Sequence, residues 1–567
     1  MGPEPATVAS VRVAPKVVVV SGHMVDAHDR PRPRFPPDQV ARVGEAVRAA
    51  LDGWGVDGST TLIAGGARGA DLIAAEAAAE RGAKVRIVLA LGPDEFEAGS
   101  VALEGTDWAQ RFRAVLSAAE VEVVEHPPGA DVYARTNARM IEAARAIDPE
   151  PHAVLVWNGE EGDGPGGTRD FVRRLGHTGP GERVRVIDPT RRAYEKRQSA
   201  PGPKKLLALD GGGIRGALSI EILRALETKL RGRYGGELVL ADYFDYIGGT
   251  STGAIIAAAL AQGKPVSEVA RKYEALGPAI FKKRRLPLQF RSMYRDGPLA
   301  EELEDFFGAD RTLGDPELLT LLLLVLHNSV TDSPWPLSNC TNAVYNRADR
   351  YLLEQPDRNL DLPLTTLIRG STAAPVFLPP QELQVGRHAF VFEDGGVTPF
   401  NNPATIMFLM ATLPEYGLGW SVGEDELLIA SVGTGSAAAA HPGLLASKVH
   451  VAFQAKNLPG VFMNGASFGQ DLFCRSLGRT RRGDPLDAEF GDRIGVTGVA
   501  GRNLFTYLRL NADLSPRALT AAGITGEKAQ ERIRKLDAVD CMPQLQELGR
   551  RVGATIDLEH DFAGFLP

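Results

Sequence analysis

A serine flanked by small residues is the clearest candidate for chemistry in this sequence of 567 residues. Ser251 stands in the motif Gly249-Thr250-Ser251-Thr252-Gly253, between the strand-like residues 246–248 and the helical run 254–260. A G-x-S-x-G motif between a strand and a helix forms a sharp turn, which lifts the serine hydroxyl out of the sheet so that a carbonyl can approach it. The context therefore predicts that Ser251 is the nucleophile of an acyl-transfer reaction.

A serine hydroxyl is a poor nucleophile until a base takes its proton, so a base is expected downstream. His327 follows a leucine-rich run, which indicates a place in the core or at a strand end. None of the other downstream histidines lies in a glycine-rich turn after a strong strand, and these are His388, His441, His450 and His560. The histidines are therefore poor candidates for the base.

Asp394 is the better candidate. It lies in Glu393-Asp394-Gly395-Gly396-Val397, after the strand-like residues 389–392. Because an unperturbed Asp has a pKa of about 3.9 and is a weak base, burial beside Ser251 is expected to raise that pKa. Taken alone, Asp-Gly-Gly would favour a plain turn.

Three consecutive glycines form the third element of this chemistry. The strand-like residues 206–209 run into Asp210-Gly211-Gly212-Gly213-Ile214-Arg215-Gly216, ahead of the helical pattern 217–230. Unobstructed backbone N–H groups at a helix N-terminus suit an oxyanion, and such donors are often the largest catalytic contribution. The same glycines would suit a phosphate, but the Lys and Ser/Thr of a P-loop are missing.

Taken together, these residues resemble the patatin-like phospholipases. The resemblance runs from about Lys205 to the C-terminal region and includes two further motifs. These are Ser371-Thr372-Ala373-Ala374-Pro375, with Phe377 and Pro379, and Ser431-Val432-Gly433-Thr434-Gly435. All the motifs stand in the order that the family has.

The resemblance implies a patatin-like α/β hydrolase domain with a catalytic dyad, in which Ser251 attacks an ester carbonyl and Asp394 acts as base without a histidine. It also implies an oxyanion hole, whose residues are Gly211, Gly212 and Gly213, with Arg215 supporting the loop. Water would then hydrolyse the acyl-serine, and neither a metal nor another cofactor is expected. The implied activity is that of a carboxylic ester hydrolase acting on glycerophospholipids or related lipids.

Upstream of this region, short apolar runs alternate with helical patterns. The runs are 17–20, 61–64, 85–91, 121–124, 153–156 and 184–187, and the helical patterns are 37–51, 71–81, 132–145 and 169–175. Continuous apolar runs are typical of strands buried on both faces. The alternation predicts an α/β fold with a doubly wound parallel sheet, in addition to the α/β hydrolase domain.

Ligands of such sheets bind at the carboxyl ends of the strands, and this sequence places small residues there repeatedly. Ser21-Gly22-His23 follows the first run, the loop 65–71 follows the second, and the fifth precedes a loop that contains Gly162, Gly164, Gly166, Gly167 and Thr168. Three such turns indicate a pocket for a phosphate or ribose. Plain βα turns are the alternative.

Residues 16–190 resemble the SLOG superfamily, Rossmann-like domains related to DprA and to the LOG phosphoribohydrolases, on the loop 65–71 and Pro165-Gly166-Gly167-Thr168. The LOG enzymes carry P-G-G-x-G-T-x-x-E, whereas here Thr168, Arg169 and Asp170 follow Gly167 and the Glu is absent. That departure favours a ligand sensor over a hydrolase. The resemblance implies binding of a nucleotide-derived ligand through Gly22, Gly66, Arg68, Gly69, Gly167 and Thr168, and His23 either contacts a phosphate or is structural.

Composition limits partners and location. With 63 Lys and Arg against 71 Asp and Glu, the net charge of -8 supplies no general attraction to nucleic acid, which is not an expected partner. Three cysteines fit a reducing compartment, and the N-terminus does not resemble a secretory signal. The longest apolar stretch, 318–326, is about half of what a spanning helix needs. A cytoplasmic protein is expected, with peripheral contact at the inner membrane face.

The expected organisation is a flexible N-terminus at 1–15, the SLOG-like domain at 16–190, an exposed linker at 191–204, and the patatin-like domain with C-terminal helices at 205–567. Residues 281–295 interleave six basic residues with Leu, Phe, Met and Tyr. They are interpreted either as a loop that docks on anionic membrane or as a solvated basic loop.

The working hypothesis is a lipid acyl hydrolase whose N-terminal domain senses a nucleotide and controls access to Ser251. Such fusions resemble effectors of bacterial defence against phage. A catalytically vestigial signalling or assembly protein and a protease with the same dyad are the alternatives. Whether the protein forms a homo-oligomer is left open.

Overall fold

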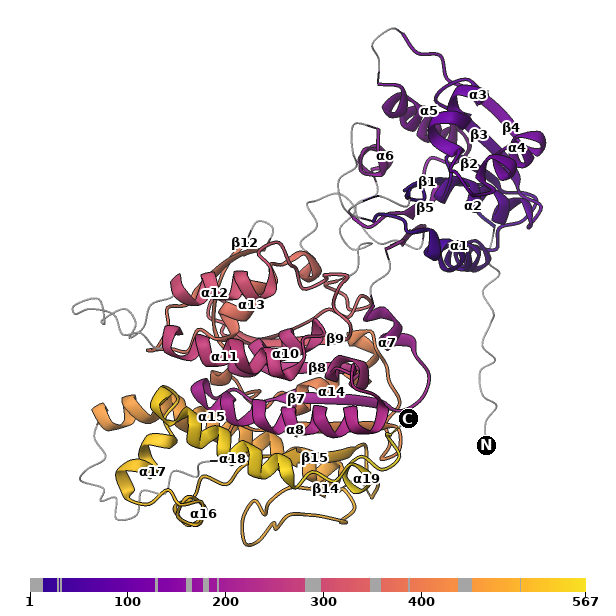
Figure 1. Ribbon diagram of the computed structural model, residues 1–567. Helices are drawn as coiled ribbons and strands as arrows, with labels where there is room; N and C mark the ends of the chain where they lie inside the picture. The colour runs from indigo at the N-terminus through magenta and orange to yellow at the C-terminus, as the bar shows by residue number, and fades with distance from the viewer. Residues whose placement is uncertain are drawn as a thin grey trace, which may run out of the picture. The chain divides into compact units, whose positions relative to one another are not determined.

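The computed structural model describes residues 14–27, 30, 33–127, 131–159, 166–176, 183–190, 193–280, 297–346, 358–385, 388–436, 451–499 and 501–566. These residues belong to two units, each with its own sheet (Figure 1). The first unit holds the described residues up to 190, and the second holds those from 193 onward.

The first unit is built on six parallel strands in the order β4-β3-β2-β1-β5-β6. The strands are β1 (Val17–Gly22), β2 (Thr61–Ala64), β3 (Lys84–Leu89), β4 (Glu120–Val123), β5 (His152–Val156) and β6 (Val184–Ile187). The direction of winding reverses between β1 and β5, which is where sheets of this kind open a crevice for a ligand.

Helices cover both faces of this sheet. One face packs against α1 (Val40–Trp54), α2 (Ala70–Ala79) and α4 (Trp108–Ala118), and the other against α5 (Val132–Ile147) and α6 (Thr168–Leu175). The remaining elements are η1 (Pro37–Gln39), α3 (Pro93–Phe96) and η2 (Glu97–Val101). Within β1, Val18 and Val20 face the first set of helices, whereas Val17 and Val19 face the second. A strand buried on both sides must be apolar at every position, which explains its continuous valine run.

The mixed α/β fold and the parallel first sheet are therefore confirmed. Each of the six predicted apolar runs contains a strand, with ends that differ by no more than two residues. Helix α4 was not predicted. Its apolar residues Trp108, Phe112, Val115 and Leu116 recur at the spacing of one helix face and pack against the core, so the signal for it was present in the sequence.

The second unit has a nine-stranded sheet, in which β11-β12-β9-β8-β7-β13-β15-β14 are neighbours and β10 pairs with β9. The strands are β7 (Lys204–Leu209), β8 (Tyr246–Thr250), β9 (Leu321–Asn328), β10 (Ser333–Ser338), β11 (Gln381–Val385), β12 (His388–Asp394), β13 (Leu427–Val432), β14 (Arg479–Arg482) and β15 (Thr506–Leu510). Strands β9, β8, β7, β13, β15 and β14 are parallel, whereas β12 is antiparallel to β9.

The α-helices of this unit surround the sheet (Figure 1). They are α7 (Glu195–Ser199), α8 (Gly216–Tyr234), α9 (Leu240–Tyr243), α10 (Thr252–Ala261), α11 (Val266–Ile280), α12 (Gly297–Phe307), α13 (Leu364–Ser371), α14 (Ala404–Thr412), α15 (Val451–Leu477), α16 (Pro516–Ala521), α17 (Glu527–Ile533), α18 (Met542–Ala554) and α19 (Leu558–Asp561). Short 3-10 turns are η3 (Gly213–Arg215), η6 (Asn359–Asp361), η7 (Gly395–Val397), η8 (Pro414–Tyr416) and η10 (Val539–Cys541). In the described parts of the chain, no helix combines the length and the apolar character that crossing a bilayer requires.

Residues 191–204 were expected to be an exposed linker, but their described part, 193–204, includes a short helix and buried side chains. It contains α7, and the side chain of Tyr194 is fully buried, with its hydroxyl donating to the Gly314 carbonyl at 3.3 Å. Lys204 begins β7 and is also buried, with its ammonium 5.0 Å from the Trp420 ring centroid. The basic segment 281–295 lies outside the described residues.

Candidate active site

Ser251 sits on a sharp turn between β8 and α10. Its backbone has a φ of 56°, which is unusual for a residue other than glycine. The flanking glycines make this turn possible, because a Cβ atom at Gly249 would overlap the Gly253 carbonyl and one at Gly253 would overlap the Leu209 carbonyl. Helix α10 begins at Thr252, so the positive end of its dipole lies beside the serine.

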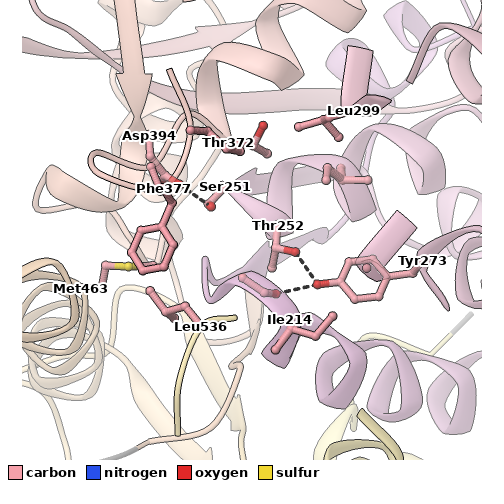
Figure 2. Close-up of a pocket in the computed structure, with 15 residues that line it drawn as sticks. Ile214, Ser251, Thr252, Tyr273, Leu299, Thr372, Phe377, Asp394, Met463 and Leu536 are labelled. Atoms are coloured by element: carbon pink, nitrogen blue, oxygen red, sulfur yellow. Dashed lines mark hydrogen bonds between the residues drawn. The ribbon is translucent and has the colours of Figure 1, made fainter. Parts of the chain in front are cut away.

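Ser251 and Asp394 are in direct contact (Figure 2). The Ser251 hydroxyl donates a hydrogen bond of 2.5 Å to Oδ2 of Asp394, and both side chains are buried. Burial raises the pKa of Asp394 to about 7, although hydrogen bonds from Ser251 and the Gly396 N–H act in the opposite direction. The antiparallel pairing of β12 with β9 brings the end of β12 beside the end of β8. The geometry is that of a hydroxyl beside a carboxylate of useful basicity.

Ser371 holds the turn in place, a role that the sequence analysis did not assign. Its hydroxyl accepts a hydrogen bond from the Ser251 N–H at 2.9 Å and donates to the Val325 carbonyl at 2.6 Å. The neighbouring Ala373 carbonyl accepts from the Asp394 N–H at 3.1 Å. The motif that begins at Ser371 therefore positions both Ser251 and Asp394, and that motif was the sequence feature from which this role could have been inferred.

The glycine loop after β7 supplies fewer donors than the sequence predicted. The Gly211 N–H donates to the Asn401 carbonyl at 3.0 Å, so it is not available to an oxyanion. The N–H groups of Gly212 and Gly213 have no acceptor among the described residues. Of the three amides predicted for the oxyanion hole, the structure excludes that of Gly211 and leaves those of Gly212 and Gly213, and Gly213 lines the pocket of Ser251.

Arg215 and Tyr273 form hydrogen bonds that hold the glycine loop. The Arg215 N–H donates to the Gly212 carbonyl at 3.2 Å, and burial lowers the pKa of its guanidinium to about 10. The Tyr273 hydroxyl donates to the Gly213 carbonyl at 2.5 Å and lies 2.7 Å from the Thr252 hydroxyl (Figure 2). Tyr273 thus links α11 to both the glycine loop and the first turn of α10.

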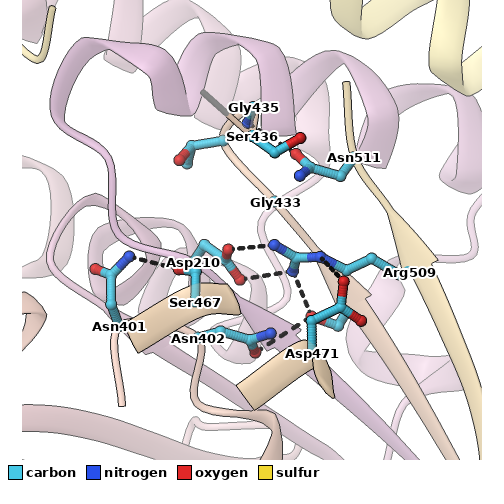
Figure 3. A network of polar contacts seen from close by, with 12 residues as sticks. Asp210, Asn401, Asn402, Gly433, Gly435, Ser436, Ser467, Asp471, Arg509 and Asn511 are labelled. Atoms are coloured by element: carbon cyan, nitrogen blue, oxygen red, sulfur yellow. Dashed lines mark hydrogen bonds and ion pairs between the residues drawn. The ribbon is translucent and has the colours of Figure 1, made fainter. Parts of the chain in front are cut away.

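A buried ion-pair network lies under the same loop (Figure 3). Arg509 donates to both carboxylate oxygens of Asp210, at 2.9 and 2.6 Å, and to the Ser431 hydroxyl at 2.7 Å. On α15, Arg475 donates to both oxygens of Asp471, at 2.8 and 3.0 Å. Burial alone would lower the pKa of Arg509, but the charge and hydrogen bonds of Asp210 outweigh it and raise that pKa. The first residue of the glycine loop is therefore half of a buried ion pair.

Asn401 connects this loop to α15. Its side-chain amide donates to the Ser467 hydroxyl at 2.9 Å (Figure 3). It also donates to the Gly211 carbonyl at 3.3 Å. Because its own backbone carbonyl also accepts from the Gly211 N–H, Asn401 holds Gly211 through both its N–H and its carbonyl. Helix α15 is thereby tied to the loop beside Ser251.

Ser251 and Asp394 open into a small pocket with an apolar lining (Figure 2). The large apolar side chains that line it are Ile214, Ile255, Leu299, Phe377, Leu378, Met463 and Leu536. They come from segments spread across more than three hundred residues of the chain. No cluster of three or more His, Cys, Asp or Glu side chains suited to a metal occurs among the residues that the structure describes.

The first unit contains a larger cavity, of about 340 Å³, at the carboxyl ends of β1 and β2. Gly22, Gly167 and Thr168, three of the residues predicted to bind a ligand, line it. The His23 ring also lines it and bonds to Asn158 at 2.8 Å, and burial lowers the pKa of His23. The cavity lies where the winding of the sheet reverses.

The other three predicted ligand residues, Gly66, Arg68 and Gly69, do not line this cavity. A Cβ atom at Gly66 would face Ile87, so this glycine serves the packing of the turn. Arg68 turns away and donates to the Val25 carbonyl at 2.9 Å, and Gly69 forms a bridge with Met24. These contacts depend on a neighbouring loop that the motif does not include.

Asp71 lines the cavity although the sequence analysis assigned it no role. Its carboxylate accepts a hydrogen bond of 3.1 Å from the Ala67 N–H, which holds the turn after β2. Burial raises the pKa of Asp71 to about 7. The Asn137 side chain also lines the cavity and donates to the Gly166 carbonyl at 2.8 Å, which holds the turn before α6. Pro165 lies outside the described residues.

Comparison with known proteins bears on the second unit. Residues 207–408 match the family model described as patatin-like phospholipase. Patatin-like protein 1 of Arabidopsis thaliana is 31% identical over 253 residues, which cover 41% of this chain and 58% of that protein. The cGAMP-activated phospholipase of Escherichia coli is 29% identical over 251 residues, which cover 43% of this chain and 66% of that protein.

The chain thus covers between half and two thirds of the length of these curated relatives. Among solved structures, human GIVD cytosolic phospholipase A2 is similar, with 12% identity and a TM-score of 0.33, over 66% of this chain and 65% of that one. The matched segment contains Ser251, Asp394 and the glycine loop. Residues 207–408 therefore form a patatin-like phospholipase domain.

Proposed function

We propose that this protein is a serine acyl hydrolase that cleaves the acyl esters of phospholipids or related lipids with a Ser251–Asp394 dyad. The observation that carries the proposal is the 2.5 Å hydrogen bond from the Ser251 hydroxyl to Asp394, at the base of an apolar pocket. The patatin-like phospholipase domain supports a lipid substrate.

In the proposed mechanism, Asp394 takes the proton of Ser251 as Oγ attacks the ester carbonyl carbon. The carbonyl oxygen becomes an oxyanion, and the N–H groups of Gly212 and Gly213 donate to it. Each such donor is worth about 3 kcal/mol. The C–O bond to the alcohol then breaks, and the departing oxygen takes the proton from Asp394. Water attacks the acyl-serine with Asp394 again as the base, which releases the fatty acid and restores Ser251.

Two observations weigh against a catalytically vestigial protein and against a protease. A vestigial patatin fold has no need of a buried, hydrogen-bonded hydroxyl and carboxylate, since burying a carboxylate costs stability. A protease needs polar groups that pair with the peptide backbone of its substrate, whereas this pocket is lined mainly by hydrocarbon side chains. An acyl chain fits that lining better.

The proposed function is tested by fatty-acid release from phospholipid across pH. We expect kcat/KM to rise with pH through an apparent pKa of about 7, because only ionised Asp394 can accept the serine proton. At pH 5 the rate should be about 100-fold below its plateau. An Asp at the ordinary value would instead give a nearly flat profile above pH 5. Such a flat profile, or peptide cleavage without release of fatty acid, would contradict the proposal.

We also propose that residues 16–190 form a SLOG-like, Rossmann-like domain that binds a nucleotide-derived ligand and regulates the hydrolase at 205–567. The supporting observation is the 340 Å³ cavity at the reversal of winding, which is within the usual size of small-molecule sites. The E. coli relative, by its name, is activated by a nucleotide, cGAMP. We propose anti-phage defence as the setting of such regulation.

Ligand binding is tested on the full chain with a panel of mono-, di- and cyclic nucleotides. A ligand at 100 times its Kd stabilises the folded state by about 2.7 kcal/mol, so a rise in Tm of the first unit is expected. Thr168→Val, which removes one hydroxyl from the cavity wall, should weaken binding, whereas Thr106→Val at an exposed loop should not. No change in Tm with any nucleotide would contradict the proposal.

A further inference from the structure

Helix α15 has two unlike faces. Toward the protein it buries Met463, Asp471, Cys474 and Arg475, and Met463 lines the pocket of Ser251. The opposite face carries large apolar side chains that are exposed to solvent, namely Val461 (60% exposed), Phe462 (52%), Phe468 (43%) and Phe473 (57%). At 3.6 residues per turn these four lie on one side of the helix. A surface helix normally turns polar residues outward.

The exposed face of α15 also carries no charge. Residues 457–470 contain no Asp, Glu, Lys, Arg or His, and Asp471 and Arg475, on either side of Phe473, are buried and paired with each other. A Cβ atom at Gly465 or Gly469, on the same side of the helix, would meet no other atom within 4 Å. No charged group would therefore have to lose its water if this face entered an apolar medium.

A second segment exposes an apolar side chain beside the same pocket. Val376 is 59% exposed and has a φ of 74°, a left-handed conformation that is costly for a β-branched residue. Its neighbours Phe377 and Leu378 point into the pocket. Residues 370–381 again contain no ionisable side chain. Backbone strain of this kind persists where the local conformation serves a function.

The two segments meet at the pocket. Phe377 from one and Met463 from the other line it on the same side as Asp394 (Figure 2). The residues that precede them in the sequence, Val376 and Phe462, are exposed to solvent. Both segments therefore carry a side chain that lines the pocket next to one that is exposed to solvent.

We propose that Val376 and the exposed face of α15 (Val461, Phe462, Phe468 and Phe473) form a surface that docks on a lipid bilayer, so that an acyl chain passes directly from the bilayer into the pocket. The inference rests on the proposed function, because lipid is the substrate that an uncharged apolar surface on the two segments bordering the pocket would meet. This docking surface does not include the basic segment 281–295, for which docking on a membrane was predicted from the sequence.

Binding is measured by flotation with vesicles of phosphatidylcholine containing one third phosphatidylglycerol. The Ser251→Ala background prevents hydrolysis of the vesicles. Phe462→Ser combined with Phe468→Ser should weaken vesicle binding at least about tenfold, since burial of a Phe side chain accounts for such a factor. The matched control is Leu413→Ser with Val422→Ser. These two residues are also exposed. They lie before the start of β13, whereas Ser251 follows the end of the parallel strand β8, so the two sites are at opposite ends of the strands. The control should bind like the parent.

In the catalytically intact protein, the ratio of turnover on vesicles to turnover on a monomeric short-chain ester should fall at least about tenfold in the Phe pair and stay unchanged in the control. If the parent binds vesicles and the Phe pair does not, while neither ester is hydrolysed, the docking proposal stands and the proposed function fails. Equal vesicle binding by the Phe pair and its parent would overturn the docking proposal.

A second measurement does not depend on how well the Phe pair folds. The three native cysteines are buried, so a dye on Phe468→Cys reports on that one position. A blue shift of a polarity-sensitive dye on adding vesicles is expected there and not on Val422→Cys. The absence of a shift at residue 468 would overturn the proposal. So would a wild-type dimer that the Phe pair converts to a monomer, because the face would then be an interface between two copies.

Discussion

Replacing Asp394 with Asn is expected to lower kcat/KM for ester hydrolysis by about 10²–10⁴-fold, the usual contribution of a general base. The amide keeps the shape of the carboxylate and still accepts from the Gly396 N–H, but it cannot take the proton of Ser251. Ser251→Ala, which removes the attacking oxygen, should cost at least as much. Initial rates on a soluble ester at pH 8 measure both effects.

The loss should not come from unfolding. The pKa of Asp394 in the folded protein lies above that of an unfolded Asp, so its ionisation opposes folding increasingly from about pH 4 and with its full effect above about pH 7. Asp394→Asn removes that opposition, and its Tm at pH 8 should equal or exceed that of the wild type. Glu393→Gln, on the next residue of β12, is the matched control and should keep nearly full activity, because its carboxylate bonds to Ser329 instead. Wild-type rates in Asp394→Asn would rule out the dyad.

Arg509→Met is expected to destabilise the second unit by about 3–5 kcal/mol, since it leaves Asp210 as an unpaired buried charge. Adding Asp210→Asn should recover part of that loss, because the remaining group is then neutral. The free energy of unfolding from urea denaturation measures both variants. Activity should fall as well, since Asp210 begins the glycine loop that carries the Gly212 and Gly213 amides.

An exposed ion pair supplies the comparison for Arg509. Arg479 and Glu424 lie 3.0 Å apart, and their side chains are partly exposed, at 47% and 32%. Arg479→Met should cost no more than about 1 kcal/mol, as solvent-exposed pairs do. Equal losses in Arg479→Met and Arg509→Met would contradict the assignment of Arg509 to a buried, structure-bearing pair.

The sequence by itself determined the features that follow from local sterics and from burial on two faces. A strand such as β1, covered on both sides, has to be apolar at every position, so its ends were predicted closely. The turn at Ser251 needs glycines at 249 and 253, because any side chain there would overlap the backbone. Asp394 could be proposed as the partner of Ser251 because it follows a strand-like run and because the motifs resemble those of the patatin-like phospholipases.

Only the tertiary structure decided which groups are already engaged and which remain free. Gly211 looks equivalent to Gly212 and Gly213 in sequence, yet Asn401, 190 residues away, takes its N–H. Asp210 and Arg509 pair across 299 residues, and Met463 reaches the pocket from a helix beyond the matched segment. Hydrogen-bond partners and burial depend on how distant segments pack. Local patterns therefore specify the turns and strands but not the contacts between them.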